Sequence, residues 1–311
     1  MTESLLQPRP VTVIMRSKNS DWVIAQALAA LFSQTFTDFE LLVADSGSTD
    51  RTLEIVAEYP HRLLRIEPEE YFPGAVLNRA IGMAEGRIIV FLNSDAVLLT
   101  TDALTTLLTT FNDPVVMAAF GRQLPRSDAH TWVRRDYAVA FPAQKDAPKW
   151  LPFSQVFSAL RKSAWEAQPF YTAAWGSEDV EWGVRARCRS WDIRYVQSAM
   201  AMHSHNYTLH QLYGRRFIEG EADAFIYGGD DSLPKMVVRI LRTLAHDLLS
   251  HQAARDLNGL LASPFRGAIA QWGYYQGHRH GEKRIANNDS DARTGQQTVL
   301  RRHESVRGAK V

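Results

Sequence analysis

The chain has a single cysteine among its 311 residues, Cys188, so an internal disulfide is excluded and a reducing compartment is favoured. No apolar run approaches the ~20 residues of a membrane-spanning helix. The N-terminal segment MTESLLQPRP also lacks the apolar core of a signal peptide. A net charge of +1, from 35 Lys and Arg against 34 Asp and Glu, argues against a nucleic-acid partner. These absences predict a cytoplasmic protein, with any membrane contact peripheral and on the inner face.

What the chain does contain is the composition of an ordinary globular protein, with 45% apolar and 22% charged residues. Its first half alternates short apolar runs with amphipathic segments. Strands are predicted at 11–15, 40–44, 63–66 and 87–92, and helices at 21–32, 49–59 and 73–84. This alternation predicts an α/β fold with a mostly parallel sheet and helices on both faces. Ligands of such sheets bind beyond the carboxyl ends of the strands.

The composition changes along the chain and predicts three parts. Residues 1–210 form the α/β part, 211–280 a helical C-terminal extension and 281–311 a polar, disordered tail. Periodicity is lost over 121–150, which predicts a loop or lid. Residues 236–249 carry a strong apolar stripe, which fits either a face packed on the core or a membrane surface.

A turn of small polar residues, VADSGSTD, follows the second predicted strand. Asp45 lies at the mouth of the sheet, where it can accept a hydrogen bond from a nucleobase or a ribose hydroxyl. The alternative is that Asp45 and Ser48 cap the next helix. Because two acidic residues around a Ser-Gly-Ser turn exceed what a cap needs, ligand binding is predicted for Asp45.

Three further clusters could carry chemistry. Asn93 and Asp95 follow the fourth predicted strand and offer oxygen ligands to a divalent cation, although one carboxylate also fits an ordinary turn. His203 and His205 alternate on an extended segment and point the same way, as metal-binding imidazoles can.

The third cluster, WGSEDVEW, holds three carboxylates between two tryptophans. Its acidic residues could simply favour the start of a helix through the macrodipole. A functional interpretation takes Asp179 as a general base, which needs a carboxylate within reach of a hydroxyl. Trp175 and Trp182 would then offer flat apolar surfaces to a sugar ring.

Taken in order, four segments resemble the inverting glycosyltransferases of family 2, which have the GT-A fold. The segments are VTVIMRSKN, FSQTFTDFELLVADSGSTDRTLEI, GAVLNRAIGMAEGRIIVFLNSDA and GSEDVEW, and the resemblance runs over about 11–220. Each is weak alone, and their order makes the match specific. EPEEYFPGAVLNRAIG and HSHNY resemble bacterial members that build surface polysaccharides, including rhamnosyltransferase-like ones.

The resemblance implies a metal-dependent hexosyl- or deoxyhexosyltransferase. Its donor would be a UDP-, dTDP- or GDP-sugar, and its acceptor a hydroxyl of a glycan or lipid-linked glycan. Asp45 matches the nucleobase contact, and Asp179 of the Glu178-Asp179 pair matches the base. Asp95 matches the last metal-binding aspartate, and one of His203 and His205 completes the shell of Mn²⁺ or Mg²⁺.

Two larger sets follow from the same resemblance. The donor-side residues are Arg16, Ser17, Asn19, Asp45, Ser48, Asn78, Asn93 and Ser94. The acceptor-side residues are Trp175, Trp182 and Glu181. The helical extension would shape the acceptor side and could contact a membrane or a second copy of the chain, as in a homo-oligomer.

Two positions depart from the family pattern. Asn93 stands where the first metal-binding aspartate is expected, and Leu77 stands where many relatives carry an arginine, so Arg79 or Arg122 would have to replace that contact. Both departures favour an alternative, a glycosyltransferase-like binding or scaffold module without catalysis, which the intact Glu178-Asp179 pair opposes. A sugar nucleotidyltransferase is a weaker alternative, because MRSKNSDW lacks the glycines of a phosphate-binding loop.

Overall fold

The computed structural model describes residues 10–254, 256–295 and 297. These residues form two compact units. The first comprises the described residues up to 126, together with 137–170 and 182–203; the second comprises 127–136, 171–181 and the described residues from 204 onward. Among the described helices, none has the length and apolar character that crossing a membrane requires.

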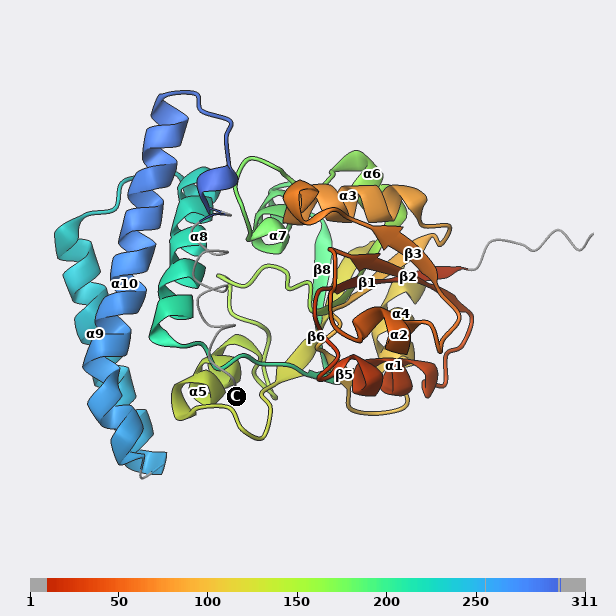
Figure 1. Ribbon diagram of the computed structural model, residues 1–311, viewed down its shortest axis with the longest axis horizontal. Helices are drawn as coiled ribbons and strands as arrows, with labels where there is room; N and C mark the ends of the chain where they lie inside the picture. The colour runs from red at the N-terminus through yellow and green to blue at the C-terminus, as the bar shows by residue number, and fades with distance from the viewer. Residues whose placement is uncertain (1–9, 255, 296, 298–311) are drawn as a thin grey trace, which may run out of the picture. The chain divides into compact units, whose positions relative to one another are not determined.

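The first unit is built on an eight-stranded sheet with the order β3-β2-β1-β4-β7-β6-β8-β5 (Figure 1). The strands are β1 (Val11–Ser17), β2 (Phe39–Asp45), β3 (Arg62–Arg65), β4 (Ile88–Leu92), β5 (Val97–Leu98), β6 (Val116–Leu124), β7 (Phe157–Arg161) and β8 (Asp192–Met202). The first four in spatial order are parallel, β7 runs antiparallel to β4 and β6, and β5 runs antiparallel to β8. The predicted α/β fold is therefore confirmed, with antiparallel strands added on one side.

Helices cover both faces of this sheet. They are α1 (Ile24–Phe32), α2 (Thr52–Val56), α3 (Pro73–Met83), α4 (Ala103–Leu108), α6 (Lys162–Ala167) and α7 (Glu178–Cys188), with short 3₁₀ turns η1 (Pro68–Glu70) and η2 (Thr109–Asn112). Because side chains alternate along a strand, Val13 and Met15 enter the core under α1 and α4 while Ile14 enters the core under α3. Burial on both faces explains why β1 reads as a continuous apolar run.

The structure differs from the loop predicted over 121–150. Strand β6 continues through Gly121 to Leu124, and α5 (Thr131–Ala140) follows it. Gly121 reads as a strand break, but a Cβ there would lie 2.5 Å from the Phe157 ring, so packing requires the glycine. Helix α5 was missed because it buries only Val133 and so lacks a clear apolar stripe.

The second unit is dominated by α8 (Leu209–Tyr227), α9 (Leu233–Ala254) and α10 (Leu257–Ala286). Helices α8 and α10 approach closely because glycines line the contact, and a Cβ at Gly277 would lie 1.9 Å from the Phe217 carbonyl oxygen. Helix α10 continues beyond the start of the predicted tail at 281, since Gly281 and Arg284 are buried. Of the predicted tail, residues 296 and 298–311 lie outside the described residues.

Candidate active site

The carboxylate of Asp45 organises the turn that follows β2. The Ser17 hydroxyl donates to Asp45 Oδ2 at 2.8 Å, because the parallel register places the two residues side by side. The Ser48 hydroxyl donates to Oδ2 at 2.6 Å, and the Ser48 and Gly47 N–H groups donate to Oδ1 at 2.8 and 3.1 Å. A carboxylate has about four lone-pair sites, and all four are used here. Asp45, 2% exposed, therefore fixes this turn, and its predicted nucleobase contact stays a prediction.

The turn after β1 is braced against the same segment. Asn19 has a left-handed backbone with φ of 48°, which asparagine tolerates better than most residues. Its N–H donates to Ser48 Oγ at 2.8 Å, and its side-chain oxygen accepts from the Thr49 N–H at 2.8 Å. Asn19 and Ser48 thus lock two of the predicted donor-side turns together.

The turn after β4 is hydrogen-bonded to the turn after β1. The hydroxyls of Ser20 and Ser94 lie 2.8 Å apart in a buried hydrogen bond, and the Ser94 N–H donates to the Arg16 carbonyl oxygen at 3.3 Å. The Asn93 N–H donates to the Val156 carbonyl oxygen at 3.0 Å, which anchors the end of β4 on the segment before β7. The structure therefore brings the predicted strand-end residues into one braced rim, which we call the strand-end rim (residues 16–20, 45–49 and 93–95).

Asn78 is placed differently from that prediction. Its side-chain oxygen accepts from Trp165 Nε1 at 2.8 Å and from the Phe170 N–H at 3.0 Å, while its amide donates to the Phe170 carbonyl oxygen at 2.8 Å. These bonds connect α3 to the segment around α6. Leu77 is fully buried in the core beside it. The described contacts of Asn78 thus support a bracing role rather than donor binding.

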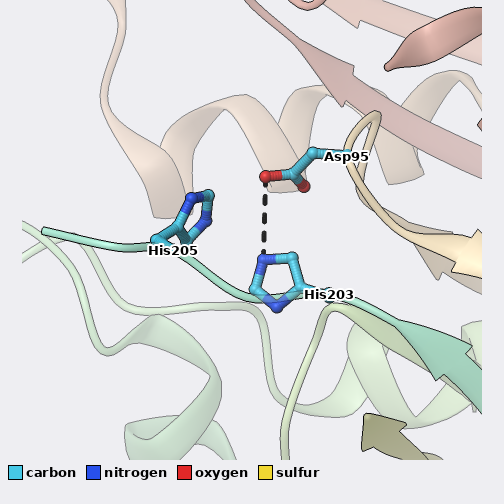
Figure 2. A group of neighbouring side chains, drawn as sticks. All are labelled: Asp95, His203 and His205. Atoms are coloured by element: carbon cyan, nitrogen blue, oxygen red, sulfur yellow. Dashed lines mark ion pairs between the residues drawn. The ribbon is translucent and has the colours of Figure 1, made fainter. Parts of the chain in front are cut away.

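Asp95 and His203 are brought together by strand pairing. Val97 pairs with Met202 in the antiparallel β5–β8 ladder. Asp95, two residues before Val97, therefore lies close to His203, the residue after Met202. The His203 Nε2 atom is 3.7 Å from Asp95 Oδ2 (Figure 2). One ligand atom from each of Asp95, His203 and His205 lies within 4.8 Å of the others, close enough that the three could hold a metal ion.

The ring of His203 is held from its other side. Its Nδ1 atom is 3.0 Å from Gln123 Oε1 and 3.0 Å from the Tyr137 hydroxyl. Gln123 Nε2 donates to Ser154 Oγ at 2.8 Å, which turns Oε1 toward the histidine. Because an amide oxygen can only accept, Nδ1 is the donor of this contact, and Nε2 is the ring nitrogen that faces Asp95. Metal-binding histidines are commonly fixed in this way by an acceptor on the second ring nitrogen.

Arg126 lies beside Asp95, which the sequence did not reveal. Its Nη2 donates to the Asp95 carbonyl oxygen at 3.1 Å, and its guanidinium lies 4.8 Å from the ring centroid of Trp22. Such stacking orients the planar cation and adds about 0.5–1 kcal/mol at an exposed site. Arg122, which the sequence offered as a donor contact, instead donates from Nε to the Phe141 carbonyl oxygen at 3.3 Å.

The acidic cluster begins α7. Gly176 and Ser177 precede it with positive φ values of 93° and 54°, and this left-handed turn starts the helix at Glu178. Glu178 is buried, while Asp179 is half-buried and accepts from the Val180 N–H at 2.9 Å. Acidic residues in a first turn are stabilised by the helix dipole. The structure is therefore also consistent with the alternative interpretation, in which these residues favour the start of the helix.

Within the second unit, this acidic turn lies near other charged and titratable groups. Burial raises the pKa of Tyr171 well above its usual value, and the carboxylates of Glu178 and Glu181 raise it further. Nearby groups, with Glu219 foremost and Asp179 among them, raise the pKa of Arg215, whose side chain is 46% exposed. Asp179 therefore lies in the field of a permanently charged guanidinium.

A buried ion pair supports the segment before α7. Arg284 Nη1 donates to Glu221 Oε1 at 2.6 Å, and its Nη2 donates to the Ala173 carbonyl oxygen at 2.9 Å. The Glu221 side chain is fully buried. Burial raises the pKa of Glu221, and the nearby Arg284 opposes that rise only in part.

The two tryptophans predicted to stack on a sugar require a correction. Trp182 is fully buried, donates from Nε1 to the Gln168 carbonyl oxygen at 2.8 Å and packs against Phe153. It is a core residue of the first unit and has no surface to offer an acceptor. Trp175 is also buried in the second unit, whereas Glu181 remains partly exposed.

Comparison with known proteins identifies the family. The profile described as Glycosyl transferase family 2 matches residues 12–167, half of the chain. The O-antigen chain rhamnosyltransferase WbaN of Salmonella anatum is 33% identical over 205 residues, covering 61% of this chain and 64% of that protein. The O-antigen chain rhamnosyltransferase RfbN of Salmonella typhimurium is 28% identical over 225 residues, covering 68% and 71%. The chain thus spans a little under two thirds of WbaN's length.

A solved structure shows the same fold. The mannosyltransferase PcManGT of Pyrobaculum calidifontis, in complex with GDP-Man and Mn²⁺, superposes with a TM-score of 0.62 over 89% of this chain and 88% of that chain, at 18% identity. The predicted GT-A fold is confirmed by this likeness. The profile match shows that the chain belongs to glycosyl transferase family 2.

Proposed function

We propose that the protein is an inverting glycosyltransferase of bacterial surface-polysaccharide synthesis. It moves a sugar from a nucleoside-diphosphate donor to a hydroxyl of a glycan or lipid-linked acceptor. The observation that carries this proposal is the Asp95–His203 pair at the edge of the strand-end rim, with the imidazole oriented by Gln123. Because WbaN and RfbN are rhamnosyltransferases, a deoxyhexosyl donor is the first candidate.

The strand-end rim is proposed to bind the nucleoside half of the donor. In this proposal Asp45 has a positioning role, because its carboxylate holds Ser17, Gly47 and Ser48 in place. The other polar groups of the rim contact the nucleotide. Arg16 and Asn93 lie on the same rim and are proposed donor contacts.

Asp95, His203 and His205 would hold the divalent ion. A mixture of carboxylate and imidazole suits Mn²⁺ better than Mg²⁺, which prefers an all-oxygen shell. When bound, the ion would supply Lewis-acid stabilisation of the charge that grows on the leaving diphosphate. Arg126, stacked on Trp22 beside Asp95, adds a fixed positive charge to the same place.

Asp179 is the proposed general base. Its carboxylate takes the proton from the acceptor hydroxyl as the hydroxyl oxygen bonds to the anomeric carbon and the bond to the diphosphate oxygen breaks. A single displacement of this kind inverts the anomeric configuration. Glu178, buried in the same helical turn, is proposed to support Asp179 rather than to take the proton.

The test compares donor binding with turnover. Purified protein is screened with Mn²⁺ against UDP-, dTDP- and GDP-sugars, by thermal shift and by release of the nucleoside diphosphate with and without acceptor. Asp179→Asn is expected to bind the donor as tightly as the wild type and to lose turnover by ~10²–10⁴-fold. Glu58→Gln, at an exposed carboxylate of the first unit that has no proposed role in the site, is the control and should retain turnover.

A non-catalytic binding module is the second candidate, favoured by Asn93 in place of a metal-binding aspartate. In that case the wild type would bind a nucleotide sugar but release no nucleoside diphosphate with any acceptor. Unchanged turnover in Asp179→Asn would instead remove the base assignment and leave the enzyme assignment standing.

A further inference from the structure

The segment that precedes α7 makes a left-handed turn directly before the proposed base. Gly176 and Ser177 have φ values of 93° and 54°, and α7 begins at the next residue. Glycine adopts a positive φ at no steric cost, whereas serine does not, because its Cβ crowds the backbone there. Ser177 therefore keeps this conformation only because the surrounding structure imposes it.

The hydroxyl of Tyr171 is bonded to this turn. It donates to the Gly176 carbonyl oxygen at 2.8 Å. That carbonyl belongs to the peptide plane between Gly176 and Ser177, so the hydrogen bond fixes the orientation of the plane. Reversing the plane would change φ of Ser177 by roughly 180°, as in the change from a type II to a type I turn. The Tyr171 hydroxyl therefore opposes the motion that would relieve the strain at Ser177.

Other contacts of the second unit hold the same segment. A Cβ at Gly176 would lie 3.3 Å from Cδ1 of Ile218, a buried residue of α8. Arg284 Nη2 donates to the Ala173 carbonyl oxygen at 2.9 Å. The contact from Tyr171 acts on the turn itself, whereas the contact from Arg284 acts three residues earlier.

The turn determines how α7 begins. The Ser177 carbonyl oxygen accepts from the Glu181 N–H at 2.9 Å, which closes the first turn of the helix. Asp179 lies between these two residues and accepts from the Val180 N–H at 2.9 Å. The backbone that carries Asp179 is thus placed by the turn before it. A general base must lie within hydrogen-bond reach of the proton that it takes, and a misplacement of about 1 Å can cost much of the rate.

We propose that Tyr171 is a positioning residue of the sugar transfer, whose hydroxyl holds the Gly176–Ser177 turn and thereby places Asp179 against the acceptor hydroxyl. This inference rests on the proposed role of Asp179 as the base. Tyr171 neither gives nor takes a proton in this role. Because burial and the neighbouring carboxylates raise its pKa, its hydroxyl stays protonated at neutral pH and remains a donor.

Tyr171→Phe removes the hydroxyl and keeps the ring, and two measurements test it. Hydrogen exchange is followed by mass spectrometry on the full chain without ligand. The amides of residues 171–181 are expected to exchange roughly tenfold faster than in the wild type, because the turn can then relax. Release of the nucleoside diphosphate, with the donor found in the screen above, should fall by about tenfold while the donor dissociation constant stays unchanged.

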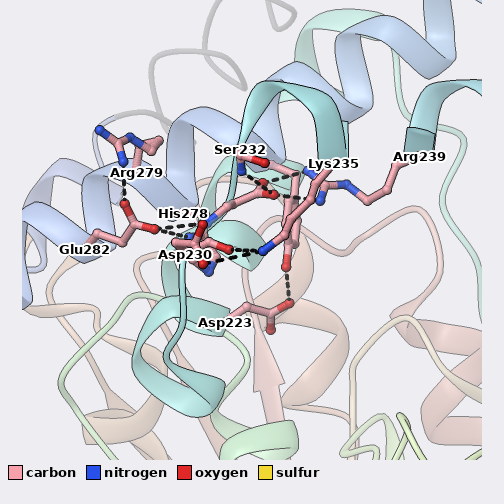
Figure 3. Close-up of polar contacts among 10 residues, drawn as sticks. Asp223, Asp230, Ser232, Lys235, Arg239, His278, Arg279 and Glu282 are labelled. Atoms are coloured by element: carbon pink, nitrogen blue, oxygen red, sulfur yellow. Dashed lines mark hydrogen bonds and ion pairs between the residues drawn. The ribbon is translucent and has the colours of Figure 1, made fainter. Parts of the chain in front are cut away.

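Tyr274 offers a matched control in the same unit. Its hydroxyl donates to Asp223 Oδ2 at 2.8 Å (Figure 3). Both tyrosines are half-buried, and burial raises the pKa of Tyr274 as it does that of Tyr171. Tyr274→Phe thus removes a hydrogen bond of the same length, and it should change neither the exchange of residues 171–181 nor turnover. An equal loss of turnover in both variants would make Tyr171 a merely structural residue and overturn the proposal.

A second substitution tests the strain at the turn. Glycine at position 177 adopts the positive φ without cost, so Tyr171→Phe/Ser177→Gly should recover part of the turnover that Tyr171→Phe loses. A double variant as slow as Tyr171→Phe would place the loss outside the turn and contradict the inference.

The two proposals fail in different ways. Unchanged turnover in Asp179→Asn removes the base assignment, and this inference falls with it. If Asp179→Asn loses turnover while Tyr171→Phe keeps the wild-type turnover, the inference is wrong and the base assignment stands. Unchanged hydrogen exchange over residues 171–181 in Tyr171→Phe also overturns the inference, whichever donor the protein uses.

Discussion

Replacement of Arg284 by methionine tests how the segment before the proposed base is held. The Arg284 side chain donates to the fully buried carboxylate of Glu221 and to the carbonyl oxygen of Ala173, and its guanidinium lies 5.0 Å from the ring centroid of Phe225. Methionine keeps much of the apolar stem but removes both donors. The variant leaves a buried carboxylate without its counter-charge and frees the backbone two residues before Trp175.

The expected cost follows from the burial of both partners. Breaking a buried ion pair by removing one partner destabilises a protein by ~3–5 kcal/mol, because the other charge stays buried and unpaired. Glu221→Gln/Arg284→Met removes both charges and should recover most of that loss. The double variant still lacks the donor to Ala173, however. Its stability is therefore expected to return while its turnover stays below the wild type.

The pH dependence gives a second readout. Burial raises the folded-state pKa of Glu221, so the folded state binds its proton more tightly than the unfolded state does. The stability that this group contributes therefore falls as pH rises from its unfolded pKa, near 4.5, through the raised folded value. Loss of Arg284 raises the folded pKa further. The deficit of Arg284→Met should accordingly be smaller at pH 5 than at pH 8.

Guanidinium unfolding followed by tryptophan fluorescence at pH 5 and pH 8 measures these differences, and steady-state kinetics measures turnover. An Arg284→Met variant within ~1 kcal/mol of the wild type at pH 8 would refute the argument from burial. If the double variant recovered turnover together with stability, the contact to Ala173 would have no positioning role.

Two more predictions concern the first unit. Gln123→Leu removes the acceptor on His203 Nδ1 and should weaken Mn²⁺ binding by ~10–100-fold in calorimetry, and unchanged affinity would detach Gln123 from the metal site. Asp45→Ala leaves the N–H groups of Gly47 and Ser48 without their acceptor and should cost ~2–4 kcal/mol in thermal or chemical unfolding. If Asp45 served the nucleobase alone, donor affinity would fall while stability stayed the same.

The strands and helices of the first half could be predicted because their signal is local. Val13, Ile14 and Met15 are all buried, on alternating faces of the sheet. A strand of a parallel sheet that is buried on both faces therefore shows as a run of consecutive apolar residues. Strand β5 has no comparable signal, since its two residues are a strand only through pairing with β8. The end of β6 was missed as well, because Gly121 has no side chain to continue the apolar pattern and serves packing against Phe157.

The site divides in the same way. Asp95 and His203 could be named from motifs, but their approach depends on the β5–β8 register, which no local pattern encodes. Arg126 could not be found, because its segment lacks periodicity and its role depends on Trp22 from a distant part of the chain. The candidate residues could therefore be named from the resemblance to a family. Their positions relative to one another depend on pairing between distant segments and could not be predicted.

In the acidic cluster, the burial of each side chain could be predicted from the sequence. Positions four apart on a helix share a face, so Glu178 and Trp182 must point the same way once α7 begins at Glu178. A tryptophan on that face belongs to the core, and the buried Glu178 follows it inward. Asp179, one residue on and turned by 100°, is left half-buried. The helical period therefore leaves Asp179 more exposed than Glu178, which supports the proposal that Asp179 is the base.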